Sequence, residues 1–281
     1  MTRLTTDDIR HISPGLSRYQ KELVTATGRS LLGLACHAWD LEEARTAERL
    51  RRLSVAVVPI TAGEGVISDF SETVCAILLG LGADARVTKA TDTSGVAEAF
   101  ETGAHAVMMS DDDRFVGLNL TTRKVADNSD ATGRVFAAAL DLMAGGVDGR
   151  ETLVLGCGPV GLAAARTLLS FGARVTLADK VPMAAERGRT ALPRHAPGGA
   201  VRVAEDPVRA TREHRLIVEA TPEANTIDAS AIHPDTFVTA PGVPLGATEE
   251  ARKCLKGRLV HDTLELGVAA MAADLLRPPE I

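Results

Sequence analysis

Aromatic residues are scarce in this chain of 281 residues, where they make up 3% and include one Trp and one Tyr. A basic excess is also missing, because 31 Lys and Arg stand against 37 Asp and Glu, for a formal net charge of −6. Proteins that bind nucleic acids usually carry basic stripes. The composition therefore argues against a nucleic-acid partner.

The four cysteines are far apart, with no C-x-x-C spacing and no adjacent histidine pair. We therefore expect neither a metal site nor a disulfide framework. No apolar run approaches the roughly 20 residues that span a bilayer, and the polar start Met1–Asp8 is unlike a signal peptide. These absences predict a cytoplasmic protein that is not associated with a membrane.

The chain is long enough for two α/β domains. Apolar residues recur at helical spacing over 16–26 and 30–50, which predicts an N-terminal helical lobe. From Leu53 to Ser110, strand-like and helix-like runs alternate, which is typical of parallel βαβ units and predicts a small α/β substrate domain.

A predicted helix over 131–143 is followed by a glycine-rich join over 144–149. We place the domain boundary there, with residues 1–149 as the helical lobe and substrate domain. Residues 150–281 are then a Rossmann domain of about six strands with a closing helix, Leu264–Leu276. That apolar helix is also a candidate homodimer interface.

A glycine-rich turn between an apolar strand and an alanine-rich helix is the most informative motif. Its G-x-G-x-x-G spacing permits a tight turn, a close backbone approach to a pyrophosphate, and close packing of the helix. The motif predicts a dinucleotide site at Gly156, Gly158, Pro159, Val160 and Gly161.

An acidic residue, Asp179, ends the next predicted strand. Its carboxylate could accept hydrogen bonds from the adenosine ribose hydroxyls and would repel a 2′-phosphate, so NAD is favoured over NADP. Lys180 follows immediately and works against that preference, because it could tolerate the phosphate.

Three further sets of loops are chemically unusual. The loop from Thr61 to Ser71 has glycines at 63 and 65 and could present backbone N–H groups to an anion. The carboxylates at 111–113 could bind an ammonium group or a divalent metal, or cap a turn. Two proline turns could hold a nicotinamide ring or only shape their loops, and they contain Thr221, Pro222 and Asn225, and Ala240, Pro241 and Gly242.

From residue 53 to the end, these motifs together resemble the pyrrolysine synthase family. The resemblance rests on Thr61-x-Gly63, Phe70-Ser71-Glu72, Met109-x-Asp111-Asp112, Asn119, Asn128, the glycine motif, Glu219-Ala-Thr221-Pro-x-Ala-Asn225 and Glu265-Leu-Gly267. Such an enzyme would use NAD to oxidise the terminal amine of a 3-methylornithine joined to the side-chain nitrogen of lysine. Loss of ammonia and ring closure would give pyrrolysine.

By this resemblance Asp111 would face the methylornithine amines and Glu265 would lie near the nicotinamide. Ala62 stands where the family is expected to have a serine, so one substrate hydrogen bond would be absent or supplied by another group. The implied substrate-binding residues are Thr61, Ala62, Gly63, Ser71, Asp112 and Asn128.

Oxidation of an amine requires a site that can remove a proton from the ammonium group. A hydride leaves only a carbon that bears a neutral amine, and deprotonating an alkylammonium of pKa about 10.4 at pH 7 costs about 4 to 5 kcal/mol. We therefore expect Asp111 to orient the ammonium while Glu265 or a water removes its proton. His105 and His261 flank buried strands and are interpreted as structural.

Two alternatives stay open. One is another NAD(P)-dependent dehydrogenase acting on an amino acid or a folate-like substrate. The other is a non-catalytic NAD sensor. In the leading interpretation the residues before Leu16 form a lid over the substrate, because water must be kept from the hydride-transfer step.

Overall fold

The computed structural model describes residues 4–10, 12–63, 67, 69–193, 199 and 201–278. Its contacts divide the chain into two compact units. The first comprises Met1–Lys21, Ser30–Ala131 and Thr263–Ile281, and the second comprises Glu22–Arg29 and Thr132–Asp262. None of the helices in the described ranges is long and apolar enough to cross a membrane.

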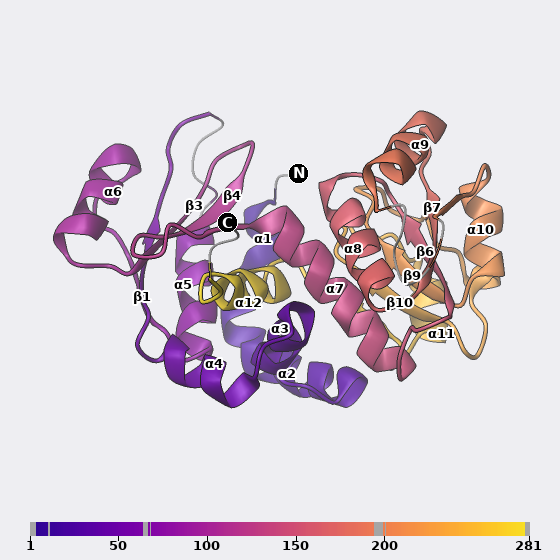
Figure 1. Ribbon diagram of the computed structural model, residues 1–281, viewed down its shortest axis with the longest axis horizontal. Coiled ribbons are helices and arrows are strands. Elements are labelled where there is room, and N and C mark those ends of the chain that lie inside the picture. The colour runs from indigo at the N-terminus through magenta and orange to yellow at the C-terminus, as the bar shows by residue number, and fades with distance from the viewer. Residues whose placement is uncertain are drawn as a thin grey trace. The chain divides into compact units, whose positions relative to one another are not determined.

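The first unit has a helical part and a five-stranded sheet of order β2-β1-β3-β4-β5 (Figure 1). Its strands are β1 Ser54–Val58, β2 Asp84–Val87, β3 Ala106–Ser110, β4 Phe115–Asn119 and β5 Val125–Asp127. Its helices are α1 Thr6–Ile9, α2 Ile12–Thr27 with its last turns in the second unit, α3 Leu31–Trp39, α4 Glu43–Leu50, α5 Phe70–Gly80, α6 Asp92–Glu101 and α12 Glu265–Asp274.

Helix α6 covers one face of this sheet through a cluster that includes Ala56, Ala99 and Val107. Helices α5 and α12 pack on strands of the same sheet and on each other, and α12 also packs on α3. The sheet is therefore buried on both sides by helices, as expected of βαβ units.

Two details of this unit differ from the sequence predictions. Strands β1, β2 and β3 are parallel, but β4 and β5 continue the sheet in antiparallel order and were not predicted. The single helix expected over 30–50 is two helices, because Asp40 adopts a left-handed conformation (φ 52°) that ends α3.

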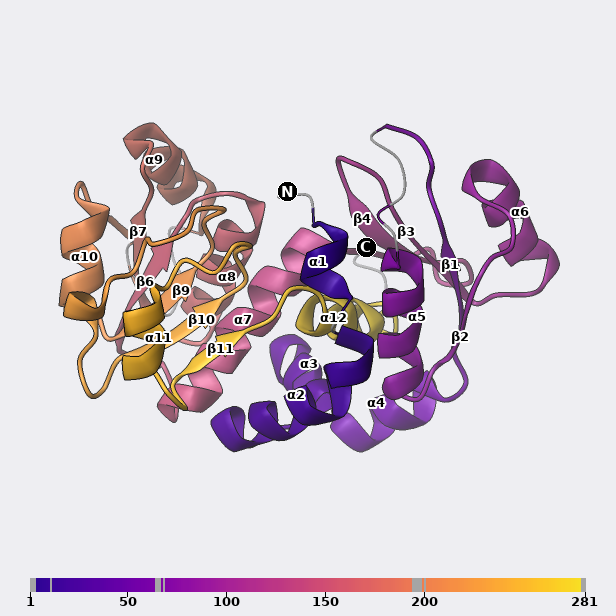
Figure 2. The same ribbon diagram turned by 180° about the vertical axis from the view of Figure 1, so that it is seen from behind.

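The second unit is a six-stranded sheet of order β11-β10-β9-β6-β7-β8 in which all pairings are parallel (Figure 2). This is the Rossmann strand order, and it confirms the predicted α/β fold with a C-terminal Rossmann sheet. Its strands are β6 Glu151–Leu155, β7 Arg174–Ala178, β8 Arg202–Val203, β9 Leu216–Glu219, β10 Phe237–Ala240 and β11 Leu259–His261.

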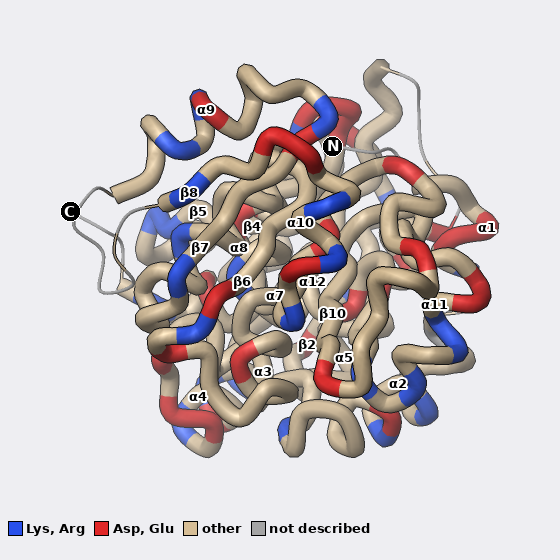
Figure 3. The backbone as a smooth tube through the Cα atoms, turned by 90° about the vertical axis from the view of Figure 1, so that its right-hand side faces the viewer, with Lys and Arg blue, Asp and Glu red and all other residues tan. Residues whose placement is uncertain are grey.

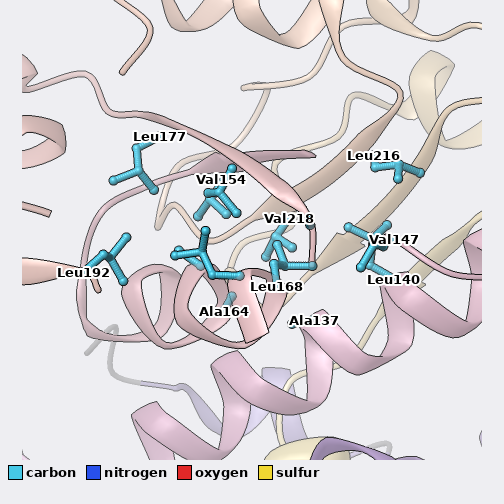
Figure 4. Packing of buried hydrophobic residues seen from close by; sticks show 14 of the residues in the cluster. Ala137, Leu140, Val147, Val154, Ala164, Leu168, Leu177, Leu192, Leu216 and Val218 are labelled. Atoms are coloured by element: carbon cyan, nitrogen blue, oxygen red, sulfur yellow. The ribbon is translucent and has the colours of Figure 1, made fainter. Parts of the chain in front are cut away.

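Helices cover both faces of the Rossmann sheet. They are α7 Asn128–Ala144, α8 Pro159–Ser170, α9 Pro182–Ala191, α10 Pro207–Glu213, α11 Glu249–Cys254 and a 3₁₀ turn, η1 Ala229–Ala231. Figure 4 shows α7 and α8 supplying Ala137, Leu140, Ala164 and Leu168 to a core shared with the strand residue Val154. Figure 3 shows acidic and basic residues interspersed along the described backbone.

The division between the units differs from the boundary expected at 149/150, because α7 packs against the Rossmann sheet. A Cβ at Gly133 of α7 would lie 2.3 Å from the carbonyl oxygen of Val160, so α7 and α8 are in close contact. The division therefore falls at 131/132.

The C-terminal helix α12 belongs to the first unit and not to the Rossmann domain. Trp39 Nε1 donates to the carbonyl oxygen of Ala270 (2.9 Å), and Asn119 Nδ2 donates to that of Leu275 (3.0 Å). Lys124 Nζ lies 3.2 Å from Asp274 Oδ1, and both side chains are nearly buried. Because every residue of α12 is buried, the helix is not available as the homodimer interface that the sequence suggested.

Candidate active site

The glycine motif forms the turn between β6 and α8. Gly156 has a positive φ of 88°, and a Cβ there would lie 2.6 Å from the carbonyl oxygen of Ala220. A Cβ at Gly161 would lie only 1.9 Å from the carbonyl oxygen of Gly156. Gly158 instead borders open space and is exposed. Two glycines are thus required by packing, and the middle one leaves room for a ligand.

Helix α8 begins directly after Gly158, with Pro159 and Val160 in its first turn. Proline suits this position because the first helical N–H has no partner within the helix. The free N–H groups and the helix dipole make such an N-terminus attractive to a phosphate. The open side of Gly158 therefore has the chemistry of a pyrophosphate site.

Asp179 follows β7 and holds the glycine turn in place. Its Oδ2 accepts a hydrogen bond from the N–H of Cys157 (2.8 Å), and its Oδ1 accepts one from the N–H of Val181 (2.9 Å). Burial and the nearby Asp179 raise the pKa of the Cys157 thiol to about 12. This cysteine stays protonated and is a structural residue.

A buried carboxylate, Glu219, lies beneath the first proline turn. It ends β9, is 0% exposed, and accepts hydrogen bonds from the N–H and hydroxyl of Thr221 and from the N–H of Gly246 (3.2 Å). Burial raises its pKa, and the bonds from Thr221 oppose that rise. Glu219 was not predicted to have a role, although an acid that ends the apolar run 216–218 is a signal for one.

The two proline turns pack against each other. A Cβ at Gly242 would lie 2.2 Å from the carbonyl oxygen of Thr221, so the backbones are in direct contact. Asn225 has a positive φ of 61°, which closes the turn that follows Pro222. Ala240 ends β10 and Pro241 follows it, and His261 Nδ1 lies 2.7 Å from the Ala240 carbonyl oxygen.

The structure thus brings together every residue predicted to bind the cofactor. They lie at the carboxyl ends of β6, β7, β9 and β10, either in the loops there, in the first turn of α8 or, for Ala240, at the last position of the strand. That edge of an open parallel sheet is where ligands bind, and the reversal of strand order between β6 and β9 marks the crevice. His261 is partly buried, and this burial lowers its pKa, in line with a structural histidine.

In the first unit, Thr61 is held by Asp92, a residue that was not predicted to belong to the site. Asp92 at the start of α6 accepts the Thr61 N–H at Oδ1 (2.8 Å) and the Thr61 hydroxyl at Oδ2 (2.6 Å). Both bonds lower the pKa of Asp92, and the bond from the Thr61 hydroxyl contributes most. The Thr61 hydroxyl therefore donates its proton to Asp92, and toward any further partner its oxygen can only accept a hydrogen bond.

The Thr61 loop meets the acidic loop at Gly63 and Asp112. A Cβ at Gly63 would lie 1.9 Å from Asp112 Oδ2, and the φ of Gly63 is 71°. Only glycine fits here, so the packing of the two loops by itself explains why residue 63 is a glycine, and no ligand is needed to explain it. Ala62 is exposed beside it, whereas the notable residues at 64–66 and 68, including Gly65, lie outside the described part of the chain.

Asp111 caps the turn between β3 and β4. Its Oδ1 accepts hydrogen bonds from the N–H groups of Arg114 (2.7 Å) and Asp113 (2.9 Å). Both bonds lower the pKa of Asp111, and the bond from Arg114 contributes most. The exposed carboxylate is therefore ionised at neutral pH. The turn-capping role left open by the sequence is present, and an ionised carboxylate remains suited to hold an ammonium group.

Arg114 connects this hairpin to the start of α7. Its Nη2 lies 2.8 Å from Asp127 Oδ2, and Asp127 Oδ1 accepts the N–H of Ser129 in the first turn of α7 (2.9 Å). Asn128, the first residue of α7, is thereby placed near the acidic hairpin. Nearby, the rings of Phe70 and Phe115 meet edge to face with centroids 5.3 Å apart.

Ser71 and Glu265 lie in the first turns of α5 and α12, and both are almost fully buried. Just before α12, the Thr263 hydroxyl donates to the carbonyl oxygen of Asp8 in α1 (3.2 Å). The short N-terminal helix is thus tied beside Glu265 within the first unit. In the described residues no group of three or more His, Cys, Asp or Glu side chains could hold a metal ion.

Comparisons with known proteins agree with this division of the chain. Residues 8–126 match the family model described as "Pyrrolysine biosynthesis protein PylD, N-terminal domain", and residues 129–245 match "Alanine dehydrogenase/PNT, C-terminal domain". The second match begins near the start of α7, which supports grouping that helix with the Rossmann sheet.

Solved structures show the same fold. The chain resembles quinate dehydrogenase from Corynebacterium glutamicum in complex with NAD (TM-score 0.54, 15% identity, 81% of this chain and 95% of that chain). It also resembles shikimate dehydrogenase from Aquifex aeolicus (TM-score 0.53, 16% identity, 78% of this chain and 90% of that chain).

Curated relatives cover nearly the whole chain. The chain is 32% identical over 278 residues to the pyrrolysine synthase of Methanosarcina barkeri, covering 98% of each protein. It is 30% identical to that of Methanosarcina acetivorans, covering 98% of this chain and 100% of the relative. The chain therefore belongs to the pyrrolysine synthase family.

Proposed function

We propose that this chain is an NAD-dependent dehydrogenase that oxidises the terminal amine of lysine-Nε-3-methylornithine. Water hydrolyses the resulting imine to an aldehyde and ammonia, the aldehyde condenses with the neighbouring amine with loss of water, and the product is pyrrolysine. Membership of the pyrrolysine synthase family carries this proposal. The residues of each unit are consistent with it.

The Rossmann unit fits NAD. The open side of Gly158 and the first turn of α8 suit a pyrophosphate, and Asp179 at the end of β7 suits the adenosine ribose. The two packed proline turns would hold the nicotinamide end, with Glu219 fixing Thr221 and Gly246. NAD, when bound, supplies the hydride acceptor.

The acidic hairpin of the first unit fits a cationic amine. Asp111 is ionised, and the guanidinium of Arg114, which could otherwise neutralise it, is engaged by Asp127. In this proposal Asp111 orients the substrate ammonium, while Glu265 or a water takes the proton that must leave before hydride transfer. Thr61, Ala62, Gly63, Ser71, Asp112 and Asn128 line the substrate pocket.

A direct assay tests the proposal. The purified protein is mixed with NAD and the lysine–methylornithine isopeptide, while NADH absorbance and product mass are followed together. We expect NADH and the ring-closed mass to form at equal rates. NADH without that mass would point to another amine or amino-acid substrate, and NAD binding without NADH from any amine would point to a sensor.

The cellular setting belongs to the same proposal. We infer a cytoplasmic enzyme, since its proposed cosubstrate NAD is available there, and a small-molecule substrate without a nucleic-acid partner. Fractionation of cells that express the chain tests the location. A homodimer would have to use a face other than α12, and light scattering of the purified protein tests it.

A further inference from the structure

The lysine after Asp179 is ion-paired with a carboxylate from a different loop. Lys180 follows β7, Glu223 lies in the loop after β9, and the Lys180 Nζ contacts Glu223 Oε1 directly. In the sheet, β7 and β9 lie on either side of β6, whose loop carries the glycines. The pair therefore joins the two loops that border the glycine turn.

This position bears on the choice between NAD and NADP. The two cofactors differ by the 2′-phosphate on the adenosine ribose, which binds beside the acid at the end of the second Rossmann strand. A cation next to that acid is the usual means of accommodating the phosphate. Lys180 has the right place in the sequence for this role. Its ion pair with Glu223 therefore decides whether the lysine charge is available to a 2′-phosphate.

The groups around the ribose position are fixed by the backbone. Both oxygens of Asp179 are held, one by the N–H of Cys157 and the other by that of Val181. The N–H of Glu223 lies 3.4 Å from the Thr221 hydroxyl, within the turn that Glu219 organises. The hydrogen bond that the Lys180 ammonium donates to Glu223 raises the pKa of Lys180, so the lysine is a cation whose charge is locally neutralised.

We propose that Glu223 is a specificity-determining residue that makes this chain select NAD over NADP by occupying Lys180. With Glu223 in place, Asp179, Lys180 and Glu223 together carry one net negative charge, which disfavours a 2′-phosphate. Without its carboxylate, Lys180 is free to pair with that phosphate. The inference rests on the proposed function only in requiring that the chain bind a dinucleotide.

The test measures binding of NAD and NADP by isothermal titration calorimetry, without substrate. The variants are Glu223→Gln, Lys180→Met and the double variant. Glu213→Gln is the matched control, because Glu213 forms a similar exposed ion pair with Arg209 on α10. Glu213 ends α10 just before β9 begins, at the opposite edge of the sheet from the glycine turn.

We expect Glu223→Gln to lower the Kd for NADP about tenfold, equivalent to about 1.4 kcal/mol, and to change the Kd for NAD less than about twofold. Adding Lys180→Met should cancel the gain, and Glu213→Gln should leave both constants unchanged. The inference is overturned if NADP affinity does not rise, or if the double variant keeps the gain. If the unaltered chain binds NAD but Glu223→Gln changes nothing, only this inference fails; if it binds neither cofactor, the proposed function fails too.

Discussion

The buried carboxylate of Glu219 accepts a hydrogen bond from the backbone N–H of Gly246, 27 residues further along the chain, at 3.2 Å. The same carboxylate accepts the N–H of Thr221 at 3.0 Å. One side chain thus fixes two loops at the carboxyl edge of the Rossmann sheet. Because it touches the loops and not the proposed cofactor position, Glu219 is a positioning residue.

Replacing Glu219 with Gln should therefore disturb these loops. The amide can accept on one oxygen only, and its NH₂ group would face a backbone donor, so we expect a loss of about 1 to 3 kcal/mol in the free energy of unfolding. The Kd for NAD should rise by a larger factor than the KM for the amine. Urea unfolding measures the free energy, calorimetry the Kd for NAD and steady-state kinetics the KM for the amine. The control is Asp228→Asn, at an exposed capping carboxylate. Equal losses for both ligands would reduce Glu219 to a purely structural residue.

Gly158 and Gly161 should respond differently to alanine. At Gly161 the new Cβ would overlap a backbone oxygen, so Gly161→Ala should destabilise the fold by about 3 kcal/mol. At Gly158 the Cβ would enter open space and the φ is an ordinary −73°, so Gly158→Ala should fold normally but bind NAD about tenfold more weakly. Thermal unfolding and NAD titration separate the two effects. Unchanged NAD affinity in Gly158→Ala would contradict the predicted pyrophosphate site.

A substitution at Asp111 can remove its negative charge while keeping the hydrogen bonds by which it caps the turn. In Asp111→Asn the amide oxygen can still accept the N–H groups of Asp113 and Arg114, so the turn should persist with a loss of at most about 1 kcal/mol. We expect kcat/KM for the amine to fall more than about tenfold, because the ammonium loses its counterion, and NAD affinity to stay constant. Full turnover in Asp111→Asn would leave the residue with a turn-capping role alone.

The buried pair of Lys124 and Asp274 should be essential for anchoring α12. Lys124→Met leaves a buried carboxylate with Arg277 as its remaining ion-pair partner, and we expect a loss approaching about 3 kcal/mol. Lys253→Met, which breaks the exposed pair with Glu249 on α11, should cost at most about 1 kcal/mol. Chemical denaturation of both variants gives the comparison. Similar losses would mean that burial does not strengthen the Lys124 pair.

His261 predicts a pH dependence of stability. Its Nδ1 donates to the carbonyl oxygen of Ala240, and burial lowers its pKa below the usual value of 6.5. The unfolded chain therefore takes up a proton before the folded one does, so this contribution is present above about pH 6.5 and is lost as the pH falls towards the lowered folded pKa.

Unfolding measured from pH 8 to pH 5 should show the unaltered chain losing stability faster than His261→Leu as the solution is acidified. Parallel curves would show that His261 has an ordinary pKa in the folded state.

The sequence by itself determined the Rossmann unit and its cofactor loops. Glycine spacing, an acid after a strand and apolar runs of strand length are local patterns, and each expresses a short-range steric or hydrogen-bonding requirement. The predicted Rossmann domain of about six strands is therefore present as the six-stranded sheet of β6 to β11. The family resemblance, carried by residues in the loops, was confirmed by the curated relatives.

Only the tertiary structure decided how distant segments pair. The antiparallel strands β4 and β5 were not predicted, and their place in the sheet depends on contacts with β3 and α12. The assignment of α7 to the Rossmann unit and α12 to the first unit follows from Gly133 and from the buried Asp274, whose partners are remote in sequence.

The same reason applies to the site. Asp92, Glu219 and Glu223 act on residues in other loops or turns, and a sequence shows a carboxylate without showing which N–H, hydroxyl or ammonium it will meet. Hydrogen bonds and ion pairs are decided by distance in space, and that distance exists only once the chain has folded.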